Sequence, residues 1–161
     1  EIPIPEFNNS SGLKSIVGFS GFGSLIWPSP KTLGIDKPIL LIGGTYDLIT
    51  PLVSEQFKIF LANKSNKYNR FLIIDGASHF SPIRVNNEFD KEDIGEDVFK
   101  IKENFIGSRP YDVQNLSLKI IIQFLEGLNK KRKLEIVKSQ RSNNLNFYVL
   151  GEKEIYIIYQ D

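Results

Sequence analysis

The sequence contains no cysteine and no methionine among its 161 residues. Without cysteine the chain has no disulfide framework, no thiol catalysis and no thiolate metal site, although this absence does not assign it to a compartment. Translation begins with methionine, so its absence has a second consequence. We expect Glu1 not to be the first residue of the gene product, and the chain to be a piece of a longer one.

The sequence also lacks an excess of charge of one sign, and it lacks long apolar runs. Lys and Arg number 20 against 19 Asp and Glu, which gives a formal net charge of +1. A chain so balanced has no overall field that would attract nucleic acid or an anionic membrane, so we expect neither as a partner. No apolar stretch approaches the roughly 20 residues that span a bilayer. We therefore expect a soluble protein that forms one compact domain.

Apolar strands and an amphipathic helix alternate in the first half of the sequence. PILLIGG at 38–44 and RFLIIDG at 70–76 are apolar runs that end near glycine, as is typical of strands in a parallel sheet covered on both faces. Between them, Thr50 followed by proline indicates a helix with Thr50 as its N-cap, ending near 63–65. LKSIVGFSG at 13–21 predicts one more short strand. This order of elements predicts a parallel crossover.

The second half begins with a long charged stretch at 84–110, which we expect to pass over the edge of the sheet as a lid. Asp112 is then expected to cap a final helix. Five residues form the apolar stripe of that helix: Leu116, Ile120, Ile121, Phe124 and Leu128. In the terminal extension at 134–161, NFYVL at 146–150 and EIYIIY at 154–159 predict a β-hairpin.

Two residues with acid–base chemistry follow the two long apolar strands. Asp47 comes directly after the run at 38–44, and His79 directly after the run at 70–76. In open α/β sheets, ligands bind at the carboxyl ends of the strands. A histidine can take a proton from a nucleophile and return it to a leaving group, while a carboxylate holds the imidazole in the required tautomer. We therefore predict that the two side chains lie within hydrogen-bonding reach.

The two segments resemble the seventh and eighth strands of the α/β-hydrolase fold, whose catalytic triad runs Ser, then Asp or Glu, then His. The family places the acid in a G-x-x-D-x-x-x-P pattern and the histidine in a Gly-small-x-His context. The matching residues are Gly44, Asp47, Pro51, Gly76, Ala77 and His79. The resemblance covers residues 13–128 and is closest to the dienelactone-hydrolase and platelet-activating-factor-acetylhydrolase-like groups. It implies the C-terminal part of a mostly parallel α/β sheet.

The nucleophile of that family is a serine in a G-x-S-x-G motif, and no such motif occurs in this sequence. The segment Gly18 to Phe22 comes nearest, with Ser20 in the nucleophile position, but Phe22 stands where a glycine is required. The resemblance therefore implies a nucleophile in an upstream, N-terminal half of the same domain. Ser20 is the alternative.

The function implied is a serine-type ester hydrolase, similar to a carboxylesterase or lipase, that acts on a small-molecule ester without metal or organic cofactor. The aromatic residues Phe22, Trp27 and Phe80 are candidates for an acyl pocket. Because triad members act as a unit, the chain by itself is expected to have no esterase turnover.

Other functions compete with this one. The first is a non-catalytic binding or interaction domain on a degenerate hydrolase scaffold. A nucleotide-binding domain lacks its G-x-G-x-x-G or Walker pattern here. A calcium loop that starts at Asp90 lacks the oxygen ligands required at Ile94 and Ile101.

Overall fold

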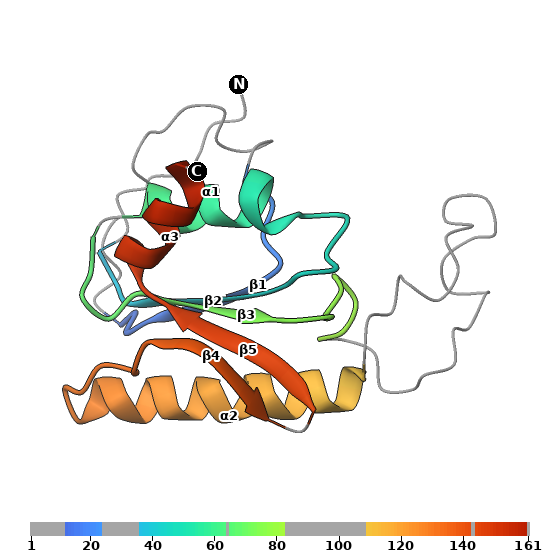
Figure 1. The fold of residues 1–161 in the computed structure, drawn as a ribbon. Coiled ribbons are helices and arrows are strands. Elements are labelled where there is room, and N and C mark those ends of the chain that lie inside the picture. Colours follow the sequence, from blue (N-terminus) through green and yellow to red (C-terminus); the bar gives the residue numbers. More distant parts are fainter. Residues whose placement is uncertain (1–11, 24–35, 64, 83–108, 143, 161) are drawn as a thin grey trace.

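The structure is a computed structural model that describes residues 12–23, 36–63, 65–82, 109–142 and 144–160 (Figure 1). Its strands are β1 (Ile16–Phe19), β2 (Ile39–Gly44), β3 (Arg70–Ile74), β4 (Val137–Ser142) and β5 (Leu145–Leu150). Its helices are η1 (Leu52–Gln56), which is a π-helical turn that continues into α1 (Phe57–Ala62), then α2 (Pro110–Asn129) and α3 (Glu152–Gln160).

The strands form a single sheet of five strands in the order β1-β2-β3-β5-β4. β1, β2 and β3 are parallel to one another, as the sequence predicted. β5 is antiparallel to both β3 and β4. The α/β class is confirmed, but the expectation of a mostly parallel sheet is wrong, because the β4–β5 hairpin adds two antiparallel strands beyond β3.

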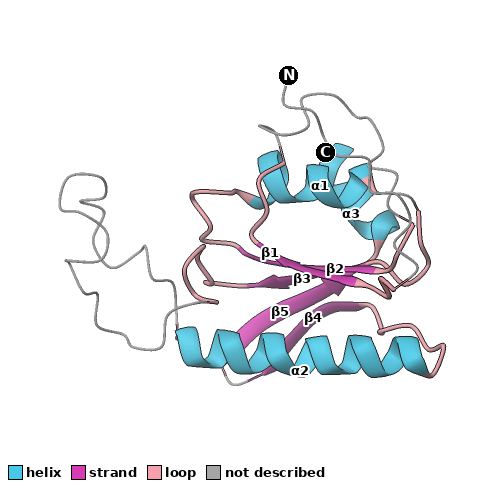
Figure 2. Cartoon of the chain, turned by 180° about the vertical axis from the view of Figure 1, so that it is seen from behind, coloured by secondary structure: helices cyan, strands magenta, loops and turns pink. Residues whose placement is uncertain are grey.

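Helices cover both faces of this sheet: α2 lies on one face, and α1 and α3 lie on the other (Figures 1 and 2). The alternation of side chains along β2 shows how the sequence fills both layers. Leu40 and Ile42 belong to the core beneath α2, whereas Ile39 and Leu41 belong to the core beneath α1 and α3. Both faces of β2 are buried, which explains why its sequence is apolar without interruption.

The core beneath α1 is built around Phe71, which is completely buried in β3. Its ring meets those of Phe57 and Phe60 edge-on, with centroid separations of 5.3 and 5.6 Å. These two aromatic residues come from α1, so they fix the position of that short helix on the sheet. The helix ends at Ala62, close to the predicted end.

Residues 154–159 lie in α3, so the strand predicted for EIYIIY is wrong. The hairpin exists, but its strands are β4 and β5, and β5 already pairs on both sides. The segment after β5 therefore has no free partner beside it. The Glu152 side chain instead accepts hydrogen bonds from Ser65 Oγ, the Asn66 amide and Asn69 Nδ2, and Ile155 is fully buried.

A buried guanidinium also ties the C-terminal elements to the start of β3. Arg70 donates to the carbonyl oxygens of Leu134 and Asn69, at 2.6 and 2.7 Å. Burial lowers the pKa of Arg70, while the carboxylates of Glu154 and Glu152 oppose this shift. The charge is thus compensated by groups from α3 and from the loop that precedes β4.

Both predicted helix caps differ from the structure. The N-cap of η1 is Pro51, and Thr50 uses its side chain elsewhere. α2 starts at Pro110, with Asp112 in its first turn, 3.8 Å from the guanidinium of Arg109. Proline suits the first helical position because it has no amide hydrogen to satisfy there.

Of the predicted lid, residues 84–108 lie outside the described residues. Within the ranges that the structure describes, no helix is both long and apolar enough to cross a membrane.

Gly44 at the end of β2 offers a test of how tightly the sheet edge is packed. A Cβ atom at this position would overlap the backbone carbonyl of Ala77. We expect Gly44→Ala to lower the free energy of unfolding, measured by urea denaturation, by about 1–3 kcal/mol. Gly12→Ala is the control, because a Cβ there meets no atom within 4 Å; it should change the free energy by less than about 0.5 kcal/mol. Equal losses of stability in the two variants would contradict the close approach of Gly44 to the Ala77 carbonyl.

Candidate functional site

The parallel strands β1, β2 and β3 end at one edge of the sheet, and each is followed by a residue singled out from the sequence: Ser20, Asp47 and His79. Asp47 and His79 are in contact. His79 Nδ1 lies 3.2 Å from Oδ1 and 3.2 Å from Oδ2 of Asp47. The predicted hydrogen-bonding reach of the pair is therefore confirmed. The Asp47 side chain is 0% exposed, whereas the imidazole is 25% exposed and meets solvent.

Four further donors surround the Asp47 carboxylate. The backbone amides of Ile49 and Thr50 donate to Oδ1, at 3.1 and 2.8 Å. Oδ2 accepts from Thr50 Oγ1 at 2.8 Å and from Gln56 Nε2 at 3.1 Å. With Nδ1 of His79, both carboxylate oxygens are fully supplied with partners. A carboxylate held in this way keeps one orientation toward the imidazole.

Thr50 links all three strand ends. Its Oγ1 lies 2.8 Å from Asp47 Oδ2, 3.1 Å from the carbonyl oxygen of Ser20 and 3.1 Å from His79 Nδ1. A hydroxyl has one proton, so it donates to one of the two oxygens and accepts from a protonated Nδ1. The sequence indicated Thr50 only as a helix cap. The D-x-x-T spacing indicated at most a bond from the backbone to the Asp47 side chain, since Asp commonly bonds the backbone a few residues ahead, and it gave no signal for the contacts of the hydroxyl.

Gln56 is the second supporting residue that sequence reasoning missed. It is 1% exposed, and its Nε2 also donates to the carbonyl oxygen of Thr50 at 2.7 Å. Its Oε1 lies so close to Gly43 that a Cβ on this glycine would overlap it. A buried amide that holds both a carboxylate and a turn carbonyl is a structural support for the acid. A polar residue in an amphipathic helix gives no sequence signal for this contact.

Hydrogen bonds also join the two loops that carry Asp47 and His79. Thr45 Oγ1 donates to Asp75 Oδ1 and accepts from the Gly76 amide, both at 2.9 Å. The Tyr46 amide donates to the carbonyl oxygen of Ala77 at 3.0 Å. Gly76 has φ 77°, a left-handed conformation that favours glycine. The distance between the acid and the histidine is thus fixed by backbone as well as side chains.

A compact turn then holds His79 itself. The Ser78 amide donates to Ser81 Oγ at 2.9 Å, and the Phe80 amide donates to Ser78 Oγ at 3.2 Å. Both serines are buried. They satisfy the backbone groups on either side of His79, so the imidazole is carried on a rigid turn.

The imidazole uses only one of its nitrogens for these contacts. Among the described residues, Nε2 of His79 has no hydrogen-bond partner within 3.5 Å. A proton on Nδ1, shared with Asp47, leaves a lone pair on Nε2. The ring is therefore arranged so that Nε2 can accept a proton from a group placed at the exposed edge.

Ser20 lies directly after β1, and its φ of 43° is unusual for a residue other than glycine. Its amide donates to the carbonyl oxygen of Ile42 at 3.0 Å, and its own carbonyl oxygen lies 3.1 Å from Thr50 Oγ1. Within the described part of the chain, no hydrogen bond joins Ser20 Oγ to His79. Residues 21–23 continue without helical structure, and the Gly23 amide donates to Glu55 Oε2 at 3.0 Å. The strand-turn-helix of a nucleophile elbow is therefore not formed there.

Apolar side chains surround His79. The ring centroids of Phe22 and Phe80 lie 6.5 and 5.5 Å from that of the imidazole. Trp27, the third aromatic residue proposed for an acyl pocket, is outside the described residues. The described residues enclose only about 10 Å³ beside His79, which is too small for an acyl group. Two apolar side chains that line this depression are more than half exposed: Tyr46 and Leu48.

In the described ranges, no group of three or more His, Cys, Asp or Glu side chains is placed to hold a metal ion. No protein-family model and no curated protein sequence matches this chain. The geometry at the edge of the sheet therefore carries the functional argument by itself.

The tautomer of His79 tests its contact with Asp47. His79 is the only histidine in the sequence, so its ring nitrogens can be assigned in NMR spectra without ambiguity. We expect the neutral ring to carry its proton on Nδ1, because Asp47 offers only acceptors. In Asp47→Asn, the new amide can donate to Nδ1, and the proton should move to Nε2. Asp36→Asn, an exposed change that lies in neither of the two loops, should leave the ¹⁵N shifts unaltered. Unchanged shifts in both variants would contradict the contact.

The role of Gln56 is open to a stability measurement. Gln56→Met keeps the approximate volume of the side chain but removes both of its hydrogen bonds, which leaves buried acceptors on Asp47 and Thr50. We expect the free energy of unfolding to fall by about 1–3 kcal/mol. Gln123→Met, at an exposed position of α2, should change it by less than about 0.5 kcal/mol. A loss no larger than that of the control would rule out a supporting role.

Proposed function

We propose that this chain supplies the acid and the base of a serine-type ester hydrolase with a triad like that of the α/β-hydrolase family. The observation that carries the proposal is the buried contact between Asp47 and His79 Nδ1, with Nε2 left without a partner among the described residues. Asp47 orients the imidazole and stabilises its cation. His79 Nε2 takes the proton of a serine hydroxyl as that oxygen attacks the acyl carbon, and then returns the proton to the leaving alkoxide.

The nucleophile has to approach His79 from the side of β1. β1 is the edge strand of the sheet, and its far side has no paired strand within the described ranges. We propose that the serine lies on a neighbouring strand of the full-length gene product, upstream of this segment. Ser20 is the alternative within the chain, since it follows β1 at the same edge and has a left-handed backbone.

An interaction domain without catalysis is the second candidate function. Its support is the exposure of Tyr46 and Leu48, which line a depression beside His79 that encloses only about 10 Å³. Exposed apolar side chains that gather on one surface are typical of sites that bind another protein segment. In that case Asp47 and His79 would only stabilise the loops.

A serine-reactive probe distinguishes the two functions. The full-length product should hydrolyse a short-chain p-nitrophenyl ester and be labelled by a fluorophosphonate on one serine. Asp47→Asn should lower kcat by roughly 10⁴-fold, and His79→Ala should lower it at least as far, because triad members act as a unit. Ser139→Ala, an exposed change on β4, should leave turnover unaltered.

The labelled serine identifies the nucleophile. Labelling upstream of this segment, with the chain of 161 residues alone inactive, is the expected result. Labelling of Ser20, lost in Ser20→Ala, would place the nucleophile within the chain. A full-length product that neither turns over the ester nor reacts with the probe would favour the interaction domain.

A further inference from the structure

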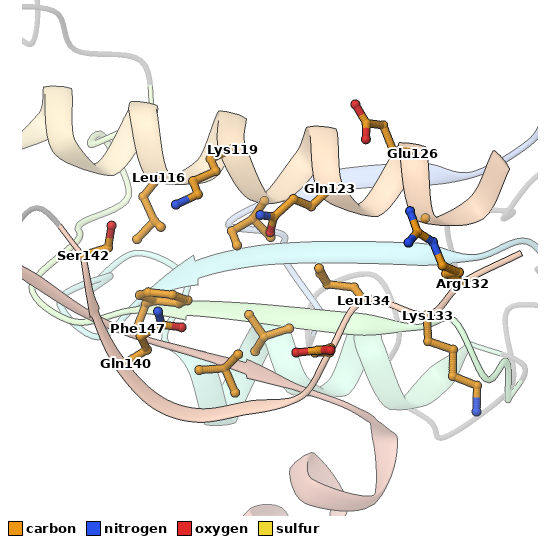
Figure 3. A pocket seen from close by; sticks show the side chains of 15 residues that line it. Leu116, Lys119, Gln123, Glu126, Arg132, Lys133, Leu134, Gln140, Ser142 and Phe147 are labelled. Atoms are coloured by element: carbon orange, nitrogen blue, oxygen red, sulfur yellow. The ribbon is translucent and has the colours of Figure 1, made fainter. Parts of the chain in front are cut away.

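A groove of about 490 Å³ lies between α2 and the β4–β5 hairpin (Figure 3). It shares no residue with the small depression beside His79. The inference drawn from this groove therefore does not rest on the proposed hydrolase function.

An extra residue in β4 shapes the groove. The register between the strands pairs Val137 with Val149 but Gln140 with Phe147, so β4 has one residue more than β5 across this interval. In a regular strand, alternation from Val137 would bring Ser139 and Arg141 to the same face. A bulge redirects the side chains that follow it. The groove is accordingly lined by the uncharged Gln140 and by Ser142 in place of a cation.

The floor of the groove is apolar. Leu116 and Ile120 of α2 face Phe147 and Val149 of β5, and all four are at most 5% exposed. Leu134 and Val137 complete this surface. The lining residues of α2 extend from Leu116 to Gly127, about 16 Å along the helix axis. Leu134 and Val137 are only partly buried, so they carry most of the apolar surface that a ligand in the groove could touch.

Hydrogen-bond donors gather at one end of the groove. Figure 3 shows the Lys119 side chain of α2 directed toward the hairpin, on the side where Ser142 lies, and Gln123 and Gln140 also line the groove. None of these four side chains has a hydrogen-bond partner among the described residues, and none is acidic. Charges of both signs line the other end: Glu126, which pairs with Lys130 at 3.7 Å, and Arg132, Lys133 and Glu135. Lys119 thus brings to the donor end a positive charge that has no acidic partner in the part of the chain that the structure describes.

We propose that this groove binds a small amphipathic anion, specifically a medium-chain carboxylate. The carboxylate accepts hydrogen bonds from Lys119 Nζ and from the amide and hydroxyl donors around it, and the alkyl chain lies over the apolar floor. The positive charge of Lys119 favours an anionic group at this end of the groove. The buried floor selects an apolar body.

Octanoate is the probe, and ¹⁵N NMR titration of the 161-residue chain is the measurement. We expect saturable shifts for amides of Leu116, Ile120 and Phe147. 1-Octanol, which has the same chain length without the charge, should bind at least several-fold more weakly. Lys119→Glu should weaken octanoate binding by roughly fivefold or more, because an attraction becomes a repulsion. Lys138→Glu, an equal change of charge on the same hairpin outside the groove, should leave the affinity within about twofold.

Several outcomes would overturn the proposal: no saturable shift, equal binding of octanol, equal effects of the two lysine variants, or shifts confined to Tyr46 and Phe80. The last pattern would place the carboxylate at the proposed hydrolase site. His79→Ala separates the two sites, because it should abolish esterase turnover of the full-length product and leave octanoate binding in the groove unchanged.

Discussion

The Asp47 side chain is completely shielded from solvent, so its carboxylate has to find every hydrogen-bond partner inside the protein. A buried carboxylate without hydrogen-bond partners costs far more free energy than a neutral polar group that is buried without partners. The partners come from three places: the turn after β2, the π-helical turn η1 and the loop after β3. The first two follow one another along the chain, whereas His79 in the third is 32 residues from Asp47. The common dependence of the three segments on one carboxylate fixes the geometry of the sheet edge.

Two local features allow these segments to come so close. Gly43 and Gly44 have no Cβ where Gln56 and the Ala77 carbonyl approach the strand. The π-helical turn η1 is wider than an α-helical turn and directs Gln56 back toward Asp47. Isolated π-turns are often found at functional sites, because the extra residue redirects a side chain. Here the redirected side chain supports the proposed catalytic acid.

The contact of Asp47 with His79 could be predicted from the sequence because it follows from strand order: two apolar runs, one helix between them, and a polar residue after each. The support by Thr50 and Gln56 could not, since it depends on a helix start one residue later than the T-P signal suggests and on a π-turn. The strand predicted for residues 154–159 was wrong for a different reason. Its β-branched and aromatic residues favour a strand, but β5 already has two partners, and tertiary context overrides propensity.

The two edges of the sheet differ in their chemistry. β4, at one edge, is mostly exposed and carries Lys138 and Arg141, and charged side chains on an edge strand oppose the addition of another strand. β1, at the other edge, has the sequence IVGF without a charge, and its Phe19 is 40% exposed. Of the two edges in the described sheet, the β1 edge is therefore the better suited to extend it. A strand added there would end beside Ser20 and His79, where the proposed mechanism requires a nucleophile.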